Sequence, residues 1–154
     1  MDLQPQKKLK TGQLLARGMA RHLNGLGFVS LEEFPPIKGL RVDLLALGRT
    51  SEIWIIECKS SREDFISDKK WQNYLPWCDQ YFWAVPSDFP VDILPEQTGV
   101  FRADGYDAEL MRDAPINTLS PTRRKSIIHR FARRAARRRA RSRPFRARRG
   151  RQRS

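Results

Sequence analysis

Three polar residues lie where the hydrophobic pattern of the chain predicts buried strands. Asp43 is the one charged residue inside the apolar segment 40–47, and Glu57 and Lys59 end the mostly apolar segment 52–59. Burying a carboxylate without a cation is costly, so this placement requires a chemical reason. Side chains two residues apart on a strand project to the same side, so Glu57 and Lys59 share one face.

Two carboxylates and a lysine on one face of a sheet suit the hydrolysis of a phosphodiester. Carboxylate oxygens bind Mg²⁺ or Mn²⁺, which polarises a phosphoryl group and lowers the pKa of a bound water. A lysine ammonium stabilises the charge that develops on the phosphate. The simpler alternative is an ion pair of Glu57 with Lys59 at a strand end, with Asp43 capping a loop. Glu-x-Lys alone is common, but an Asp fourteen residues earlier, inside an apolar strand, favours the metal site.

A hairpin is needed to bring these residues together. The segment 48–51, Gly-Arg-Thr-Ser, predicts a turn that joins the two apolar segments as antiparallel strands and sets Asp43 beside Glu57. Before it, apolar residues at helical spacing predict a helix over 10–26, and 28–34 predicts a first strand.

The segments after the hairpin predict further strands and two helices. A helix, continuous or broken, begins after Ser61, has acids in its first turn and reaches toward Trp77. A second helix begins at Ser120-Pro121 and runs to about Arg139. Strands are predicted over 80–85, 91–94, 99–103 and 108–112. This order predicts an α/β fold with a mixed sheet flanked by helices.

The net charge of +13 is concentrated in the C-terminal part of the chain. From Ala114 onward there are sixteen basic residues, fifteen of them Arg, and no Asp or Glu, whereas 1–113 holds fourteen basic and seventeen acidic residues. Such a segment favours a polyanion, because neutralised phosphates release counterions, and the excess of Arg favours nucleic acid over a mere solubility tail. We expect a core over 1–119, a basic helix over 120–140 and a disordered Arg-rich tail over 141–154.

Composition excludes several classes of protein. Two cysteines are too few for a disulfide framework or a zinc cluster, and Cys58 is expected to be buried rather than nucleophilic. No apolar run is long enough to cross a bilayer, so we expect no membrane partner and a cytoplasmic, nucleoid-associated protein. The aromatic residues around 71–83 are expected to pack in the core rather than stack on bases.

The run Arg41-Val42-Asp43 … Glu57-Cys58-Lys59 resembles the PD-(D/E)XK nuclease signature, with Val42 in place of the usual proline. More narrowly, the chain resembles the MmcB-like family of bacterial DNA-repair proteins in 16–23, 41–44, 53–61, 64–65, 68–71, Tyr74, 78–85 and the Arg- and Ala-rich C-terminal helix. The resemblance covers roughly 10–139, and its middle third is the specific part. It implies a restriction-endonuclease-like core, with a helix before the sheet and one after the Lys59 strand.

The resemblance also implies roles for the site residues. Asp43, Glu57 and Lys59 would be catalytic, and Asp43 and Glu57 would bind Mg²⁺ or Mn²⁺. The superfamily often takes a further acid from the first helix, which here has none. Glu33 is the substitute as a metal ligand and Glu32 the alternative, because adjacent strand residues point opposite ways.

Residues expected to bind nucleic acid lie on both sides of this site and in the basic segment. They are Arg41, Lys69, Tyr74, Arg133, Arg137, Arg141 and Arg148. Lys69 and Asp64 also have plainer interpretations, as a solvated side chain and as support for a helix start. The family pattern usually has a second arginine where Val42 stands, so one phosphate-facing charge is missing here.

The leading hypothesis is a DNA-repair protein with a divalent-metal-dependent nuclease site and DNA as its partner. Two alternatives stay open: a non-catalytic nucleic-acid-binding protein of the same fold, and a basic RNA-binding protein. A homodimer also stays open, since many proteins of this architecture act as dimers.

Overall fold

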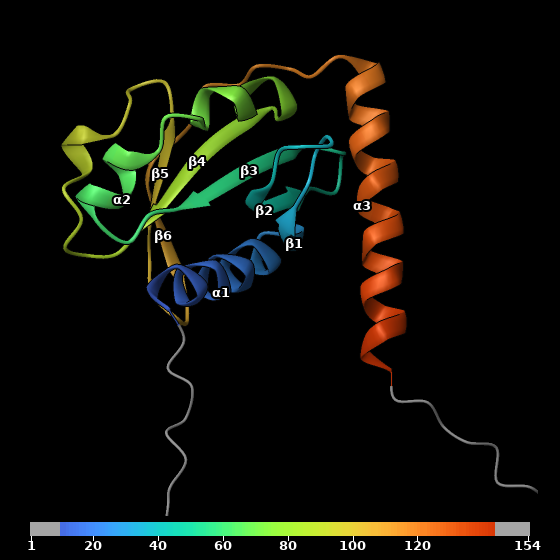
Figure 1. Ribbon diagram of the computed structural model, residues 1–154, viewed down its shortest axis with the longest axis horizontal. Coiled ribbons are helices and arrows are strands. Elements are labelled where there is room, and N and C mark those ends of the chain that lie inside the picture. The colour runs from blue at the N-terminus through green and yellow to red at the C-terminus, as the bar shows by residue number, and fades with distance from the viewer. Residues whose placement is uncertain (1–9, 144–154) are drawn as a thin grey trace, which may run out of the picture.

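The computed structural model describes residues 10–143 and has an α/β architecture, with one mixed sheet and helices on both of its faces (Figure 1). In chain order the elements are α1 (Thr11–Gly25), β1 (Val29–Phe34), β2 (Val42–Leu47), β3 (Ile53–Cys58), α2 (Arg62–Ser67), the 3₁₀ helix η1 (Trp71–Trp77), β4 (Gln80–Val85), the 3₁₀ helix η2 (Val91–Ile93), β5 (Gly99–Ala103), β6 (Ala108–Arg112) and α3 (Pro121–Ser142). Within residues 10–143, no helix is both long enough and apolar enough to cross a membrane.

The six strands follow one another across the sheet in chain order. β1, β2 and β3 form an antiparallel meander, β3, β4 and β5 are parallel, and β6 returns antiparallel to β5. The predicted hairpin is therefore confirmed, with Leu47 opposite Ile53 and Leu44 opposite Ile56. The parallel centre requires crossovers, and the segment with α2 and η1 supplies the one between β3 and β4.

Each face of the sheet carries its own hydrophobic core. α1 covers one face with Leu15, Met19 and Leu23, which are at most 2% exposed. η1, α2 and the first turns of α3 pack on the other face, around Trp83 and Val85 of β4. β4 is buried at nearly every position because it is covered on both sides, as its uninterrupted apolar sequence predicts.

Gly18 allows α1 to lie close to the turn between β5 and β6. A Cβ at this position would be 1.9 Å from the carbonyl oxygen of Asp104. Only a residue without a side chain fits there, so Gly18 fixes α1 beside the carboxyl ends of the parallel strands.

Two predicted elements differ from the structure. The prediction of a strand over 91–94 is wrong: Val91–Ile93 is a 3₁₀ helix, preceded by Pro90 and closed by a hydrogen bond from the Leu94 N–H to the Val91 carbonyl (3.1 Å). The buried Leu94 lies three residues after the partly buried Val91, a spacing that suits a tight helical turn. The C-terminal helix ends at Ser142 rather than near 140, so the first residues of the predicted tail are helical. Residues 144–154, including Arg148, lie outside the described residues.

Candidate active site

The strands β2 and β3 separate at the end where Asp43 and Glu57 lie. Their backbone pairing stops at Leu44 and Ile56, and side chains replace the ladder beyond that point. The Asp43 N–H donates to Oε1 of Glu57 (2.8 Å), and the Cys58 N–H donates to Oδ2 of Asp43 (2.7 Å). Each carboxylate thus bonds to the backbone of the other strand, and the two carboxyl groups meet in the gap.

Burial makes this carboxylate pair electrostatically unfavourable by itself. Glu57 is only 6% exposed, and burial together with the charge of Asp43 raises its pKa to about 9. Burial also raises the pKa of Asp43, although the Cys58 N–H and the Glu57 side chain oppose that shift. Two adjacent carboxylates in a medium of low polarity do not both ionise unless a cation joins them. The pair therefore needs a shared proton or a bound cation.

Lys59 follows Glu57 on the same face and is held by Asp68. Its Nζ lies 2.9 Å from Oδ2 of Asp68, and the two side chains are only 11% and 13% exposed. The other oxygen of Asp68 accepts the Lys70 N–H (2.9 Å), so this carboxylate is itself fixed at the end of α2. The ammonium of Lys59 is thereby anchored, and its charge acts to lower the pKa of both Asp43 and Glu57.

Asp68 was not predicted as a site residue. It lies nine residues beyond Lys59, in a segment whose path depends on where α2 ends. The one signal available in the sequence is its place within the family-like segment 68–71.

A pocket of about 450 Å³ opens from Asp43 toward the first turn of α1. Asp64, Glu32 and Glu33 line it together with Asp43 and with Lys10–Gln13 of the helix start. The four carboxylates outnumber the one cation on this pocket, Lys10, so the pocket favours cations over a phosphate.

Glu32 and Glu33 both line this pocket, although strand alternation predicts that only one of them faces the site. Glu33 has a left-handed backbone (φ 48°), which breaks the alternation of β1. Its Oε2 lies 4.0 Å from Nη1 of Arg41, and both side chains are more than two-thirds exposed. Among residues 10–143, no three His, Cys, Asp or Glu side chains converge closely enough to hold a metal ion by themselves. A cation between Asp43 and Glu57 would therefore take its other ligands from water and substrate, and the role of Glu33 stays a prediction.

Asp64 orders the loop that follows Lys59. Its Oδ2 accepts hydrogen bonds from the N–H (3.1 Å) and the hydroxyl (3.4 Å) of Ser60, while its own N–H donates to the Ser61 hydroxyl (3.1 Å). The predicted helix start at Ser61 is thus confirmed. The Asp64 carboxylate therefore both orders the start of α2 and lines the Asp43 pocket.

The aromatic residues pack behind the site, as predicted. Trp83 and Phe82 are fully buried, and Tyr81 is 2% exposed. The Tyr81 hydroxyl is buried and has no hydrogen-bond partner within residues 10–143; burial and then the charge of Glu57 raise its pKa. Tyr74 is half-buried, and burial followed by Glu57 raises its pKa as well. Both phenols therefore lie in the electrostatic field of the carboxylate pair, whereas Lys69 is exposed.

Asp79 fixes α3 to the sheet. Its carboxylate accepts two hydrogen bonds from the Arg124 guanidinium (both 2.7 Å) and one each from the N–H groups of Ile53 (2.8 Å) and Leu119 (2.9 Å). Beyond Phe131, no α3 residue within the described chain is buried, and the helix extends along the edge strand β1 (Figure 1). The Arg138 guanidinium donates to the Glu32 carbonyl.

The arginines of α3 form a stripe next to β1. A groove of about 420 Å³ lies between the helix and the start of the β1–β2 connection, and it is lined by Phe34, Pro35, His129, Arg130, Arg133, Arg134, Arg137, Arg138 and Arg141. Arg133, Arg137 and Arg141 are exposed. β1 separates this groove from the Asp43 pocket, because Glu32 and Glu33 line the pocket while Phe34 lines the groove.

Comparisons with known proteins agree with this architecture. The family described as "DNA repair protein MmcB-like" matches residues 3–144. A solved structure of a protein of unknown function from Silicibacter pomeroyi is 60% identical and superposes with a TM-score of 0.83, over 85% of this chain and 90% of that chain. No functionally curated protein matches the chain.

Proposed function

The chain belongs to the MmcB-like family of DNA repair proteins, and we propose that it hydrolyses phosphodiester bonds of DNA at Asp43, Glu57 and Lys59 with Mg²⁺ or Mn²⁺. The observation that carries this proposal is the pair of carboxylates that bond across the gap between β2 and β3, with the anchored ammonium of Lys59 following Glu57 on the same face. In a purely structural ion pair, Lys59 would neutralise Glu57. Here Lys59 bonds to Asp68 instead, so the negative charge of the two carboxylates is not neutralised by a directly bonded cation of the described chain.

The donor set fits a hard divalent cation. Asp43 and Glu57 offer carboxylate oxygens, the ligands that Mg²⁺ and Mn²⁺ prefer, and few protein ligands leave positions for water and phosphate oxygens. When bound, such an ion supplies charge neutralisation at the phosphoryl group and a water of lowered pKa.

The side chains of the protein have separate roles in this proposal. Asp43 and Glu57 would hold the cation, and their cross-strand hydrogen bonds keep both carboxylates oriented before substrate arrives. Lys59, positioned by Asp68, donates to the phosphate and stabilises its developing negative charge. Of the three residues only Asp43 lines the acidic pocket, whose carboxylates would repel a phosphate unless a cation offset their charge, so hydrolysis should depend on the cation.

Binding of DNA is assigned to α3. The stripe of Arg133, Arg137 and Arg141 follows the axis of the helix beside β1, so a duplex on this stripe passes close to the Asp43 pocket. In this proposal the two charged regions have different roles. The arginines bind the phosphate backbone of DNA, and the acidic site binds the metal ion and the phosphate that is cleaved. Arg41 is exposed next to Glu33, where it can bind the phosphate backbone of the same DNA.

Cleavage assays test this proposal. Plasmid and branched DNA are incubated with Mg²⁺ or Mn²⁺ and with the wild type, Asp43→Ala or Lys59→Ala; Asp88→Ala, an exposed carboxylate away from the site, is the matched control. We expect cleavage by the wild type and the control, and a loss of at least about a hundredfold for the two site variants. Cleavage that survives both changes would reject the site. Binding without cleavage by the wild type on any substrate would leave a non-catalytic DNA-binding protein.

A further inference from the structure

Three buried side-chain donors of the described chain have no hydrogen-bond partner within residues 10–143. They are Nε1 of Trp54, Nε of Arg102 and the hydroxyl of Tyr81. Leaving a buried donor unpaired has a free-energy cost, so each of these groups requires an explanation. Trp54 lies on the face that α1 covers, where its ring centroid is 4.3 Å from that of Phe28 and 4.7 Å from that of Phe82. Its surroundings are apolar, so it marks no binding site.

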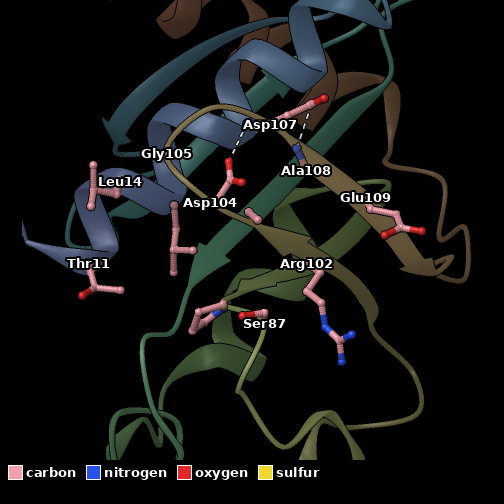
Figure 2. Close-up of a pocket in the computed structure, with 12 residues that line it drawn as sticks. Thr11, Leu14, Ser87, Arg102, Asp104, Gly105, Asp107, Ala108 and Glu109 are labelled. Carbon is pink, nitrogen blue, oxygen red and sulfur yellow. Dashed lines mark hydrogen bonds between the residues drawn. The ribbon is translucent and has the colours of Figure 1, made fainter.

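Arg102 lies on β5, two strands away from the β3 strand that carries Glu57 (Figure 2). In Figure 2 its guanidinium points away from Asp104 and Asp107, whose carboxylates hold the β5–β6 turn. No described residue near Arg102 belongs to the candidate active site. The Tyr81 hydroxyl is therefore the one unpaired donor of the three that can be related to the carboxylate pair.

Tyr81 lies beside the carboxylate pair, on the face of the sheet that η1 covers. It pairs with Ile55 across the parallel strands, and the next residue on that face of β4, Trp83, pairs with Glu57. Tyr81 and Glu57 are therefore diagonal neighbours on one face, a separation that an aromatic side chain can span. Burial, and after it the charge of Glu57, raises the pKa of the Tyr81 hydroxyl, so this group is a protonated donor at neutral pH.

Two tryptophans fix the ring of Tyr81. The Trp83 ring meets it edge to face, with the centroids 5.1 Å apart, and the Trp71 centroid lies 6.0 Å away. Tyr81 as a whole is only 2% exposed. Its hydroxyl cannot turn to solvent from this position, so an acceptor for it has to come from the carboxylates nearby.

Glu57 has an acceptor oxygen that matches this donor. Its Oε1 accepts the Asp43 N–H (2.8 Å), and no donor within residues 10–143 bonds to its other oxygen, Oε2. Both oxygens of Asp68 are occupied, one by Lys59 and one by the Lys70 N–H. Asp43 lines the pocket toward α1 instead. A buried donor without an acceptor and a buried acceptor without a donor are thus left as neighbours on one face.

We propose that Tyr81 is a positioning residue for Glu57: once a divalent cation is bound, its hydroxyl donates to the free Oε2 of the ligating carboxylate. This inference rests on the proposed function, since it requires the cation between Asp43 and Glu57. Because Glu57 is held through one oxygen only, its carboxylate can turn so that Oε2 meets the phenol. Hydrogen bonds to a ligating side chain orient it, and their loss commonly lowers metal affinity about 10–100-fold.

Binding of Mn²⁺ in the absence of DNA tests this role without requiring catalysis. The full chain is titrated with Mn²⁺, and the free ion is followed by electron paramagnetic resonance. We expect Asp43→Ala to abolish binding at the carboxylate pair and Tyr81→Phe to weaken it about tenfold. Phe keeps the ring between Trp71 and Trp83 and removes only the hydroxyl, so this variant should fold.

Two further measurements separate positioning from a structural role. In urea, the metal-free Tyr81→Phe protein should be at least as stable as the wild type, because the deleted hydroxyl has no partner in the described chain. In cleavage, the Mn²⁺ concentration for half-maximal rate should rise about tenfold, while the rate at saturating Mn²⁺ stays near that of the wild type. Tyr106→Phe makes the same change at a residue that is 77% exposed and should leave every measurement unchanged.

The outcomes separate this role from the proposed function. Weaker Mn²⁺ binding by Tyr81→Phe, with no loss of metal-free stability, supports the positioning role even where no DNA is cleaved. Equal Mn²⁺ affinity of Tyr81→Phe and the wild type, with binding lost in Asp43→Ala, would overturn the role and keep the cation site. Weaker binding by a less stable Tyr81→Phe protein would assign the hydroxyl to packing instead. Mn²⁺ binding that survives Asp43→Ala, or that the wild type lacks, would overturn both proposals.

Discussion

Glu57 belongs both to the buried end of β3 and to the carboxylate pair, and the two roles conflict at neutral pH. Its pKa is raised to about 9, so the folded protein keeps a proton that the unfolded chain releases near pH 4.5. For a group whose pKa rises on folding in this way, its contribution to stability is most favourable below about pH 4.5. It becomes less favourable as the pH rises toward 9.

Glu57→Gln is expected to stabilise the metal-free protein and to abolish cleavage. Gln keeps an oxygen that can accept the Asp43 N–H, but it never ionises beside Asp43. We expect the free energy of unfolding to exceed that of the wild type by roughly 1–4 kcal/mol at pH 8 and to converge with it near pH 4. Urea unfolding at the two pH values measures the difference. Glu63→Gln, at an exposed position of α2, should show no such divergence, and a constant gap for Glu57→Gln would contradict its raised pKa.

Asp68 is expected to act on catalysis through Lys59. Asp68→Ala frees the ammonium to leave its position, so kcat should fall about tenfold to a hundredfold while KM changes little, because Asp68 is not expected to touch DNA. Asp68→Asn keeps an acceptor oxygen and should recover part of kcat. The exposed Asp92→Ala is the control. A rise in KM at constant kcat would instead assign Asp68 to DNA binding.

At the scale of single residues, the sequence predicts only those positions in the site that follow from strand geometry. Alternation sets Glu57 and Lys59 on one face, and the turn at 48–51 sets the register that pairs Leu44 with Ile56, which brings Asp43 opposite Glu57. The partnership of Lys59 with Asp68 depends on the residue at which α2 stops, and the backbone of Glu33 departs from the strand conformation that alternation assumes. Neither feature has a local sequence signal.

At the scale of elements, Asp79 joins β3, β4 and α3 in one buried hydrogen-bond cluster. Burial alone would raise its pKa, but the hydrogen bonds from Arg124 and from the N–H groups of Leu119 and Ile53 outweigh it and lower the pKa. The stabilisation is therefore complete above about pH 4 and is lost as the pH falls through the lowered value.

Asp79→Ala should destabilise the fold by about 3–5 kcal/mol at pH 7, because it leaves Arg124 and two buried N–H groups without an acceptor. The destabilisation should shrink toward pH 2, where the wild type loses the same interaction. Urea unfolding as a function of pH checks both statements, and Asp88→Ala is the matched exposed control. A destabilisation that stays the same from pH 7 to pH 2 would show that packing, not charge, sets the effect.

Strands with continuous apolar sequence are predicted well and short mixed segments poorly. The segment 80–85 is a strand with the same bounds in sequence and structure, because burial on both faces leaves it little alternative. The segment 91–94 has β-branched residues but lies between two prolines, and tertiary contacts of Leu94 select a 3₁₀ turn instead. Between 61 and 77 the structure has two short helices rather than one, because the backbone is extended at Asp68 between them.

At the scale of the whole molecule, negative charge gathers in the Asp43 pocket and positive charge on α3, and β1 lies between them. The sequence predicts this division from the run of arginines alone, but it does not predict that α3 returns along the edge strand. That return depends on Asp79 and on Phe131 packing against Phe34, whose ring centroids are 6.0 Å apart. The edge of the sheet is thereby covered by the same helix that would carry DNA.

The placement of the arginine stripe predicts a face-specific effect on DNA affinity. Replacing Arg133, Arg137 and Arg141 by Gln removes three charges along about 12 Å of one helix flank. We expect the slope of log affinity against log salt to fall by about 0.9 for each phosphate that the helix no longer neutralises. The matched control replaces Lys125, Arg139 and Arg143 by Gln, three exposed cations on the other flank, none of which lines the groove beside β1. Net charge falls equally in both variants, so a smaller change in slope for the control supports DNA lying beside β1, within reach of Asp43. Equal slopes would mean that α3 attracts DNA by total charge alone, and the route from the arginines to the acidic pocket would then lose its support.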